Sequence, residues 1–221
     1  MIEFKHVYKA YLANVPCLRD VSFQVNEGDF VFVVGPSGAG KTTLFKLITA
    51  YESKNTGEIR ILGHNLSSLK KGQIPFLRRE IGMVLQNYKL LKNKTIFENI
   101  ELPLVIRGVS KEERILKTEQ IIEKVGLSAH RDQFPDFLSG GEQQRVAIAR
   151  ALVPSPRIVI ADEPTGNLDS DLSQSIMQLF KDFSKQGVTF LVATHDERLV
   201  KTAGGRVLRI NRGQVSEENF R

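Results

Sequence analysis

Gly35-Pro36-Ser37-Gly38-Ala39-Gly40-Lys41-Thr42 is the stretch that decides the fold. An apolar run at residues 30–34 precedes it and predicts a buried strand, while residues 43–48 predict the first turns of a helix. The glycines let the backbone bend so that successive N–H groups point at one anion, and the helix N-terminus adds its dipole. Strand, loop and helix together predict a cradle for phosphate groups, which we call the phosphate loop.

Two side chains of the phosphate loop have chemistry of their own. Lys41 is expected to reach the β- and γ-phosphates of a nucleotide as a point charge, and the Thr42 hydroxyl is expected to ligate Mg²⁺. The other residues expected to contact phosphate are Gly35, Pro36, Ser37, Gly38, Ala39, Gly40 and Thr43. The alternative is a glycine-rich loop that only turns the chain, and the flanking strand and helix argue against it.

Length and composition narrow the class of protein. The 221 residues fit one α/β domain with a subdomain, and the single cysteine, Cys17, excludes an intramolecular disulfide and favours a reducing compartment. The net charge of +6 could indicate nucleic acid or an anionic membrane surface. No basic run is dense enough for a nucleic-acid arm, and the chain has no Trp for base stacking. We therefore expect a dispersed basic surface and no nucleic-acid partner.

Membrane insertion is not expected of the chain itself. Its N-terminus lacks the apolar core of a signal peptide, and its longest apolar runs fall far short of the ~20 residues that span a bilayer. Any role at a membrane would come through a partner.

The order of strand and helix patterns predicts the architecture. Residues 2–8 and 18–25 predict two antiparallel strands that feed a parallel sheet, with Tyr11 between them as a packing residue or as a stacking partner for adenine. Between about residues 87 and 155 the pattern is helical, with one helix kinked or ended by Pro103 and another that begins at Ser110 and stops at Gly126. Residues 206–215 predict a terminal hairpin. The sequence thus predicts one α/β domain over residues 1–221, with a helical subdomain at about 87–155.

Polar residues follow several of the predicted strands. Asp162 and Glu163 follow a buried strand, where Asp162 would hold Mg²⁺ and Glu163 would act as general base for an attacking water. Gln86 and His195 follow two others, and could bridge Mg²⁺ and water and hydrogen-bond the γ-phosphate, respectively. Because strand ends meet at one edge of a parallel sheet, we expect these groups near the phosphate loop.

A second anion site is predicted far along the chain, where Leu138-Ser139-Gly140-Gly141-Glu142 opens a helix. We call it the signature segment. Since the chain already has a phosphate loop, a second γ-phosphate cradle makes sense if it serves the nucleotide of another copy. Two head-to-tail copies related by a two-fold axis would then enclose two ATP molecules.

The signature segment resembles that of the ATP-binding-cassette (ABC) ATPases, and the resemblance extends over essentially the whole chain. The phosphate loop is similar to the Walker A motif of that family, and residues 158–163 are similar to Walker B. Other matches are Gln86 (Q-loop), residues 166–169 with Asp169 (D-loop), His195 (switch histidine) and Tyr11 (A-loop aromatic). The resemblance implies a P-loop NTPase fold: a mainly parallel core sheet, an antiparallel β subdomain and a helical subdomain. It also implies an ATPase that dimerises on ATP, and it favours adenine stacking for Tyr11.

Within the family, residues 161–169 resemble a group that includes lipoprotein-releasing, macrolide-efflux and cell-division ATPases, and residues 75–82 and 134–150 look most like the cell-division members. This resemblance implies an integral membrane partner similar to FtsX, a peripheral position on the cytoplasmic face of the bacterial cell membrane, and regulation of peptidoglycan hydrolysis. The alternative is the ATPase subunit of a lipoprotein or macrolide exporter. ABC proteins that act on ribosomes or DNA usually have two cassettes or a long coiled-coil insertion, and this chain has neither.

Docking of the partner is expected near Gln86. The apolar candidates are Tyr88, Leu90, Leu91, Phe97 and Leu102. The alternative for these side chains is packing within the helical insert.

Overall fold

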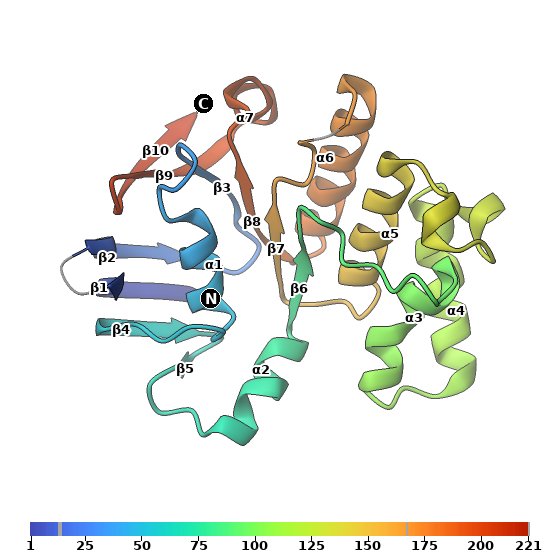
Figure 1. Cartoon of the computed structure of the whole chain (residues 1–221), viewed down its shortest axis with the longest axis horizontal. Helices are drawn as coiled ribbons and strands as arrows, with labels where there is room; N and C mark the ends of the chain where they lie inside the picture. The colour runs from blue at the N-terminus through green and yellow to red at the C-terminus, as the bar shows by residue number, and fades with distance from the viewer. Residues whose placement is uncertain (13–14, 167, 221) are drawn as a thin grey trace.

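A six-stranded sheet runs through the middle of the computed structural model, which describes residues 1–12, 15–166 and 168–220 (Figure 1). Its order is β10-β9-β3-β8-β7-β6. The parallel strands are β9 (Gly205–Asn211), β3 (Phe30–Val34), β8 (Thr189–Thr194), β7 (Ile158–Asp162) and β6 (Ile81–Val84). Antiparallel β10 (Gln214–Phe220) pairs with β9 in the predicted hairpin. Arg212 and Gly213 close it with positive φ, which matches the twist of a two-residue turn.

The first two strands are antiparallel, as predicted; they belong to a sheet of their own, from which the chain leads through the turn at residues 26–29 into β3. The order of this sheet is β2 (Val15–Val25), β1 (Ile2–Leu12), β4 (Thr56–Ile61) and β5 (His64–Asn65). Strand β1 pairs with β2 on one edge and with β4 on the other. Register shifts after Phe4 let β1 continue to Leu12, and Tyr11 therefore lies within β1 instead of between strands.

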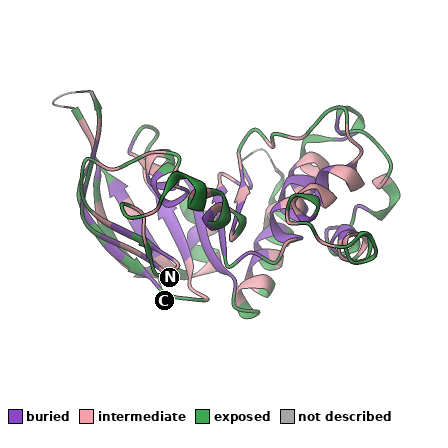
Figure 2. Ribbon diagram, turned by 90° about the horizontal axis from the view of Figure 1, so that it is seen from below, coloured by how far each residue is buried: buried purple, intermediate pink, exposed green. Residues whose placement is uncertain are grey.

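The two faces of the six-stranded sheet pack against different layers. Alternate residues of β3 show this, because Val31 and Val33 join one apolar cluster while Phe32 and Val34 join the other. The first cluster includes α1 (Lys41–Ile48) and the antiparallel sheet. The second includes α3 (Ile96–Ile106), α4 (Lys111–Lys124), α5 (Gly140–Leu152) and α6 (Ser170–Lys185). Buried residues follow the strands and the inner sides of the helices in both layers (Figure 2).

Local signals explain the ends of the helices. Thr95 and Ser110 cap α3 and α4 by accepting hydrogen bonds from backbone N–H groups three residues on, and Gly126, with φ 66°, follows the end of α4 as predicted. Helix α3 continues past Pro103 to Ile106.

Two short 3₁₀ turns, η2 (Ser128–His130) and η3 (Pro135–Phe137), lead into α5. Two more elements precede β6, η1 (Lys71–Gln73) and α2 (Ile74–Arg79), and α7 (Glu197–Ala203) was not predicted.

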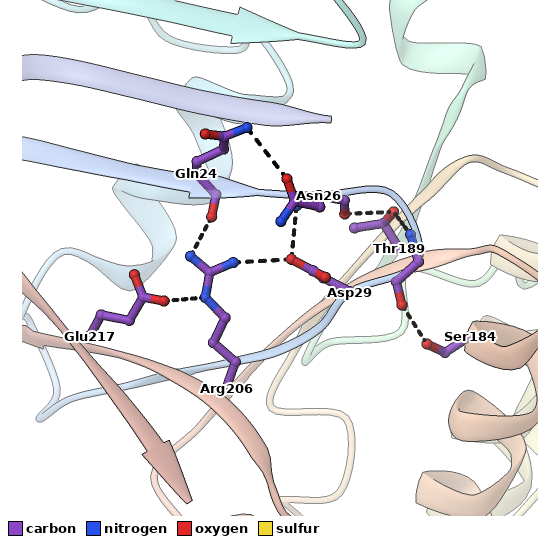
Figure 3. A network of polar contacts seen from close by, with 8 residues as sticks. Gln24, Asn26, Asp29, Ser184, Thr189, Arg206 and Glu217 are labelled. Carbon is purple, nitrogen blue, oxygen red and sulfur yellow. Dashed lines mark hydrogen bonds and ion pairs between the residues drawn. The ribbon is translucent and has the colours of Figure 1, made fainter.

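A polar network ties the turn before β3 to α6 and to the C-terminal hairpin (Figure 3). Arg206 of β9 contacts the Asp29 carboxylate at 3.0 Å and also bonds Glu217 and the carbonyl of Gln24. Thr189 accepts a hydrogen bond of 3.0 Å from the Gly28 N–H. These bonds fix the end of the sheet where β3, β8 and β9 begin. The phosphate loop lies at the opposite end of the sheet, where the parallel strands have their C-terminal ends.

The mainly parallel core sheet with an antiparallel β subdomain confirms the predicted fold class. Across the described ranges, no helix combines the length and apolarity that crossing a membrane requires.

Candidate active site

The phosphate loop leaves β3 and enters α1 through glycines that the neighbouring strands enclose. A Cβ on Gly35 would lie 2.3 Å from the Ile210 carbonyl oxygen of β9, and a Cβ on Gly40 would lie 2.9 Å from Leu18 Cδ2 of β2. Gly40 caps α1 with φ 115°, a value that favours glycine. Packing against two other strands therefore holds the backbone of the loop in its curved form.

Lys41 folds back over the phosphate loop. Its Nζ donates to the carbonyl oxygens of Gly35 at 2.6 Å and Pro36 at 3.2 Å. The ammonium group is thereby held over the concave side of the loop, at the N-terminal end of α1. Charge, N–H groups and helix dipole favour an anion here, so the residues present fit the phosphates of a nucleotide.

Asp162 ends β7 beside the phosphate loop. Burial raises the pKa of the Asp162 carboxyl and the negative charge of Glu163 raises it further, while Lys41 and a hydrogen bond from Thr42 act in the opposite direction. The same interactions show that Lys41, Thr42 and Glu163 all lie close to Asp162. A hydroxyl and a carboxylate are oxygen ligands of the kind that Mg²⁺ prefers, so this corner also fits the cation.

Glu163 adopts an unusual backbone conformation that turns its side chain toward His195. Its φ is 50°, and its N–H donates to the Ala193 carbonyl of β8 at 3.0 Å. Its carboxylate Oε1 lies 2.9 Å from Nδ1 of His195. The Glu163 side chain is 13% exposed whereas that of His195 is 73% exposed. The pair borders a hollow of about 430 Å³ whose lining includes Thr165, Gly166, Thr194 and Asp196.

Gln86 lies exposed two residues beyond β6. The loop after it contains Tyr88 and Lys89, which have φ values of 50° and 51°. Arg150 of α5 donates to both of their carbonyl oxygens, at 2.6 Å and 2.9 Å. Sequence reasoning missed Arg150, although a charged residue inside the apolar run of residues 146–152 was a usable signal.

Tyr11 lies beside the helix that follows the phosphate loop. Its side chain is half exposed, and the ring centroid lies 4.8 Å from Nζ of Lys9 and 6.0 Å from Nζ of Lys46, a residue of α1. An exposed aromatic ring at this position is available for stacking.

The signature segment is organised by its own chain. Ser139 caps α5, and its Oγ lies 2.7 Å from Glu142 Oε2, while the N–H of Glu142 donates back to Ser139 Oγ at 3.3 Å. The hydrogen bond from Ser139 lowers the pKa of Glu142. Gly141 is close-packed, since a Cβ there would lie 2.6 Å from Leu172 Cδ2 of α6. Asp169 caps α6 by accepting a hydrogen bond from the N–H of Leu172 at 2.9 Å, while Asn167, which belongs to the same D-loop match, is outside the described residues.

The predicted residues thus fall into two groups. The phosphate loop, Asp162, Glu163 and His195 gather at the edge where the parallel strands end. The signature segment lies elsewhere, because α1 packs on one face of the sheet and α5 on the other (Figure 1). Within the described ranges, no hydrogen bond or ion pair joins residues 139–141 to residues 35–43.

Comparison with known proteins defines the class. The model of the ABC transporter family matches residues 18–166. A solved structure titled as a dimeric, post-hydrolysis state of the ATP-binding cassette MJ0796 bound to ADP and Pi superposes with a TM-score of 0.92 at 36% identity, and covers 100% of this chain and 99% of that one. The chain therefore belongs to the ABC transporter family and is an ATPase of the P-loop NTPase fold.

Within this family the chain is similar to the cell division ATP-binding protein FtsE. It is 46% identical to the Escherichia coli (strain K12) protein over 97% of each chain, and 44% identical to the Bacillus subtilis (strain 168) protein over 100% of this chain and 97% of the other. The resemblance to the cell-division members of the family is thereby confirmed.

Proposed function

We propose that two copies of this chain close head to tail on two ATP molecules, with the phosphate loop of one copy facing the signature segment of the other. The observation that carries this proposal is the position of the signature segment: Ser139 and Gly140 are exposed, and the segment lies on the opposite face of the sheet from the helix of its own phosphate loop. The similar MJ0796 cassette is described as dimeric, which supports the arrangement.

The residues that hold the nucleotide follow from their positions. The backbone N–H groups of Gly35 and residues 37–43 and the ammonium of Lys41 bind the phosphates, and Tyr11 stacks on the adenine. Thr42, Asp162 and Gln86 are the groups that would hold Mg²⁺, directly or through water. When bound, the cation neutralises charge on the phosphates. Ser139, Gly140 and Gly141 present a hydroxyl and N–H groups to the nucleotide of the partner copy, and Asp169 lies on the same side of the composite site.

Glu163 supplies the general base. Its carboxylate takes a proton from the attacking water, and the hydroxide oxygen forms its bond to the γ-phosphorus as the bond to ADP breaks. His195, 2.9 Å away, holds the carboxylate by one oxygen and leaves the other for the water. His195 also hydrogen-bonds the γ-phosphate in the closed dimer.

The chain acts as one domain over residues 1–221, in which the helical subdomain at about 87–155 receives a membrane protein. A groove of about 400 Å³ lies between β6 and α3, and its apolar lining includes Met83, Leu102, Pro103 and Ile106. Leu90 and Phe97 pack against the core instead, and Leu91 is 40% exposed. An apolar groove on this side suits a cytoplasmic helix of an integral membrane protein.

We further propose an FtsX-like partner, a peripheral position at the cytoplasmic face of the membrane, and control of peptidoglycan hydrolysis in cell division. Support comes from the E. coli and B. subtilis relatives, whose name assigns them to cell division. Affinity purification from solubilised membranes is the test. We expect an FtsX-type protein to be retained, and recovery of a lipoprotein-releasing permease in its place would favour the exporter alternative.

The catalytic proposal is tested with Glu163→Gln. Loss of the base should lower turnover by about 100-fold or more, while ATP-bound dimers accumulate because closure precedes hydrolysis. Glu27→Gln is the control, since Glu27 is exposed and, among the described residues, its one ion-pair partner is Arg157. Steady-state phosphate release measures turnover for both variants. Wild-type turnover in Glu163→Gln would remove Glu163 from the mechanism.

A further inference from the structure

Arg150 is a charged residue within the apolar stretch of α5. Its guanidinium donates from Nη2 to the Tyr88 carbonyl at 2.6 Å and from Nη1 to the Lys89 carbonyl at 2.9 Å. Burial lowers the pKa of Arg150. In the part of the chain that the structure describes, no carboxylate lies within ion-pair distance of this guanidinium. Two backbone carbonyls are therefore its principal partners.

The backbone that Arg150 holds is in an unfavourable conformation. Tyr88 and Lys89 are consecutive non-glycine residues with left-handed φ values of 50° and 51°. The Tyr88 N–H donates to the Leu85 carbonyl at 3.0 Å, so the turn closes directly around Gln86. Such strain persists where the surroundings fix it, and the rigid planar fork of arginine holds two separate nitrogens in a fixed geometry toward the two carbonyls, whereas a lysine ammonium is a single donor centre on a flexible chain.

The first turn of α5 touches the same loop. The Tyr88 hydroxyl lies 3.5 Å from the position that a Cβ on Gly140 would occupy. Helix α5 has 13 residues, which corresponds to a length of about 20 Å. The loop after Gln86 is thus in contact with α5 at both ends, beside the signature segment at Gly140 and at Arg150.

We propose that Arg150 is a positioning residue that fastens the loop carrying Gln86 to the signature helix, and so fixes where the Gln86 amide is presented to the nucleotide and its cation. This inference rests on the proposed roles of Gln86 and the signature segment. Helix α5, which begins in the signature segment, thereby links that segment to Gln86. When α5 moves as the dimer closes, Arg150 displaces the carbonyls of residues 88 and 89, and Gln86 moves with them. Arg150 itself does not touch the nucleotide.

The test compares Arg150→Met with a matched control, Arg78→Met. Arg78 also donates to two consecutive carbonyls, those of Thr49 and Ala50, both at 3.0 Å, and Ala50 also has a positive φ of 53°. For Arg150→Met we expect kcat to fall about tenfold or more, and the Mg²⁺ concentration for half-maximal activity to rise, because a displaced Gln86 misplaces the cation and water. The Kd for ATP should stay within about twofold of wild type. Arg78→Met should retain wild-type kcat and Mg²⁺ dependence, although its melting temperature falls.

A double-mutant cycle with Gln86→Ala separates positioning from general stability. If Arg150 acts through Gln86, Arg150→Met should lower kcat little further once Gln86 is absent. An equal drop in kcat with and without Gln86 would overturn the proposal, as would a kcat of Arg150→Met equal to that of Arg78→Met. Arg150→Lys gives the same comparison if the methionine variant does not fold, and should also lose kcat because the shorter, flexible ammonium lacks the fixed two-nitrogen geometry that holds both carbonyls. Glu163→Gln, run in parallel, keeps the outcomes distinct: its turnover tests the proposed function and is independent of Arg150.

Discussion

The phosphate loop and the signature segment are both glycine-containing turns at the N-terminus of a helix, yet the chain treats them differently. The phosphate loop is enclosed by its own chain, with Gly35 against β9, Gly40 against β2 and Lys41 bonded to loop carbonyls. In the signature segment Ser139 and Gly140 are exposed, and among the described residues the Ser139 side chain bonds only to Glu142, within the capping box. One region is shaped for a ligand inside a single copy, whereas the other presents its donors outward.

The difference indicates where the binding site is incomplete. Asp162 and Glu163 lie with the phosphate loop, so one copy holds the groups that we propose bind and hydrolyse ATP. Apart from the capping of α5 by Ser139, the outward donors of the signature segment gain a binding role when a second copy brings a nucleotide to them. On this account ATP supplies the free energy of hydrolysis and, while bound, also bridges the two copies.

The largest expected difference between the two regions is in the change of stability caused by a glycine-to-alanine substitution. Gly35→Ala should lower the free energy of unfolding by about 3 kcal/mol or more, because its Cβ would lie 2.3 Å from a backbone oxygen that cannot move freely. Gly140→Ala, a helical position whose nearest contact is 3.5 Å away, should be neutral or stabilising by about 0.5–1 kcal/mol. Denaturant unfolding measures both variants. Equal losses would contradict the distinction between an enclosed and an open turn.

A smaller effect is expected on nucleotide affinity. Lys41→Ala should weaken ATP binding about 100-fold, equivalent to roughly 2.7 kcal/mol, because a charged donor to the phosphates is removed. Ser139→Ala should leave the affinity of the single copy nearly unchanged, since the signature segment faces outward. Fluorescence titration of dilute protein with a labelled ATP analogue provides both values. A large loss for Ser139→Ala in the single copy would place the signature segment in its own chain's site.

The smallest effect concerns the carboxylate next to the phosphate loop. Because burial and Glu163 raise the folded-state pKa of Asp162 above its ordinary value of 3.8, the folded state binds this proton more tightly than the unfolded state. The free energy of unfolding therefore falls as pH rises from 3.8 through the folded pKa, and the loss remains at higher pH. Asp162→Asn should raise the melting temperature at neutral pH by about 2–4 °C, a figure that already allows for solvent screening of a partly exposed group.

Two measurements complete this prediction. The gain in melting temperature should disappear below about pH 3, where the carboxyl is protonated in both states. Turnover of Asp162→Asn should be lost at every pH. A variant that is less stable than wild type at pH 7 would show that the Asp162 charge is favourable in the nucleotide-free protein.

Much of the fold, and the grouping of the phosphate loop with Asp162, Glu163 and His195, could be predicted because their signals are local. The phosphate loop is contiguous, and Asp162, Glu163 and His195 lie at or just after the C-terminal ends of β7 and β8, which are neighbours in the sheet. Tyr11 was misplaced because register shifts lengthen β1, a property of its pairing with β2. The hydrogen bonds of Arg150 reach Lys89 and Tyr88, which precede it in the chain by 61 and 62 positions. The sequence around Arg150 marks the residue as unusual, but no local pattern encodes which carbonyls it contacts.

The most direct test of the composite site is the mass of Glu163→Gln in solution, measured by light scattering with and without ATP and Mg²⁺. The account predicts one copy of 24.8 kDa without ATP and two copies with it. It also predicts that adding Ser139→Arg returns the ATP-bound sample to one copy while the isolated chain still binds ATP. A single copy in the presence of ATP, or a dimer that tolerates Ser139→Arg, would contradict the claim that the two regions meet across an interface.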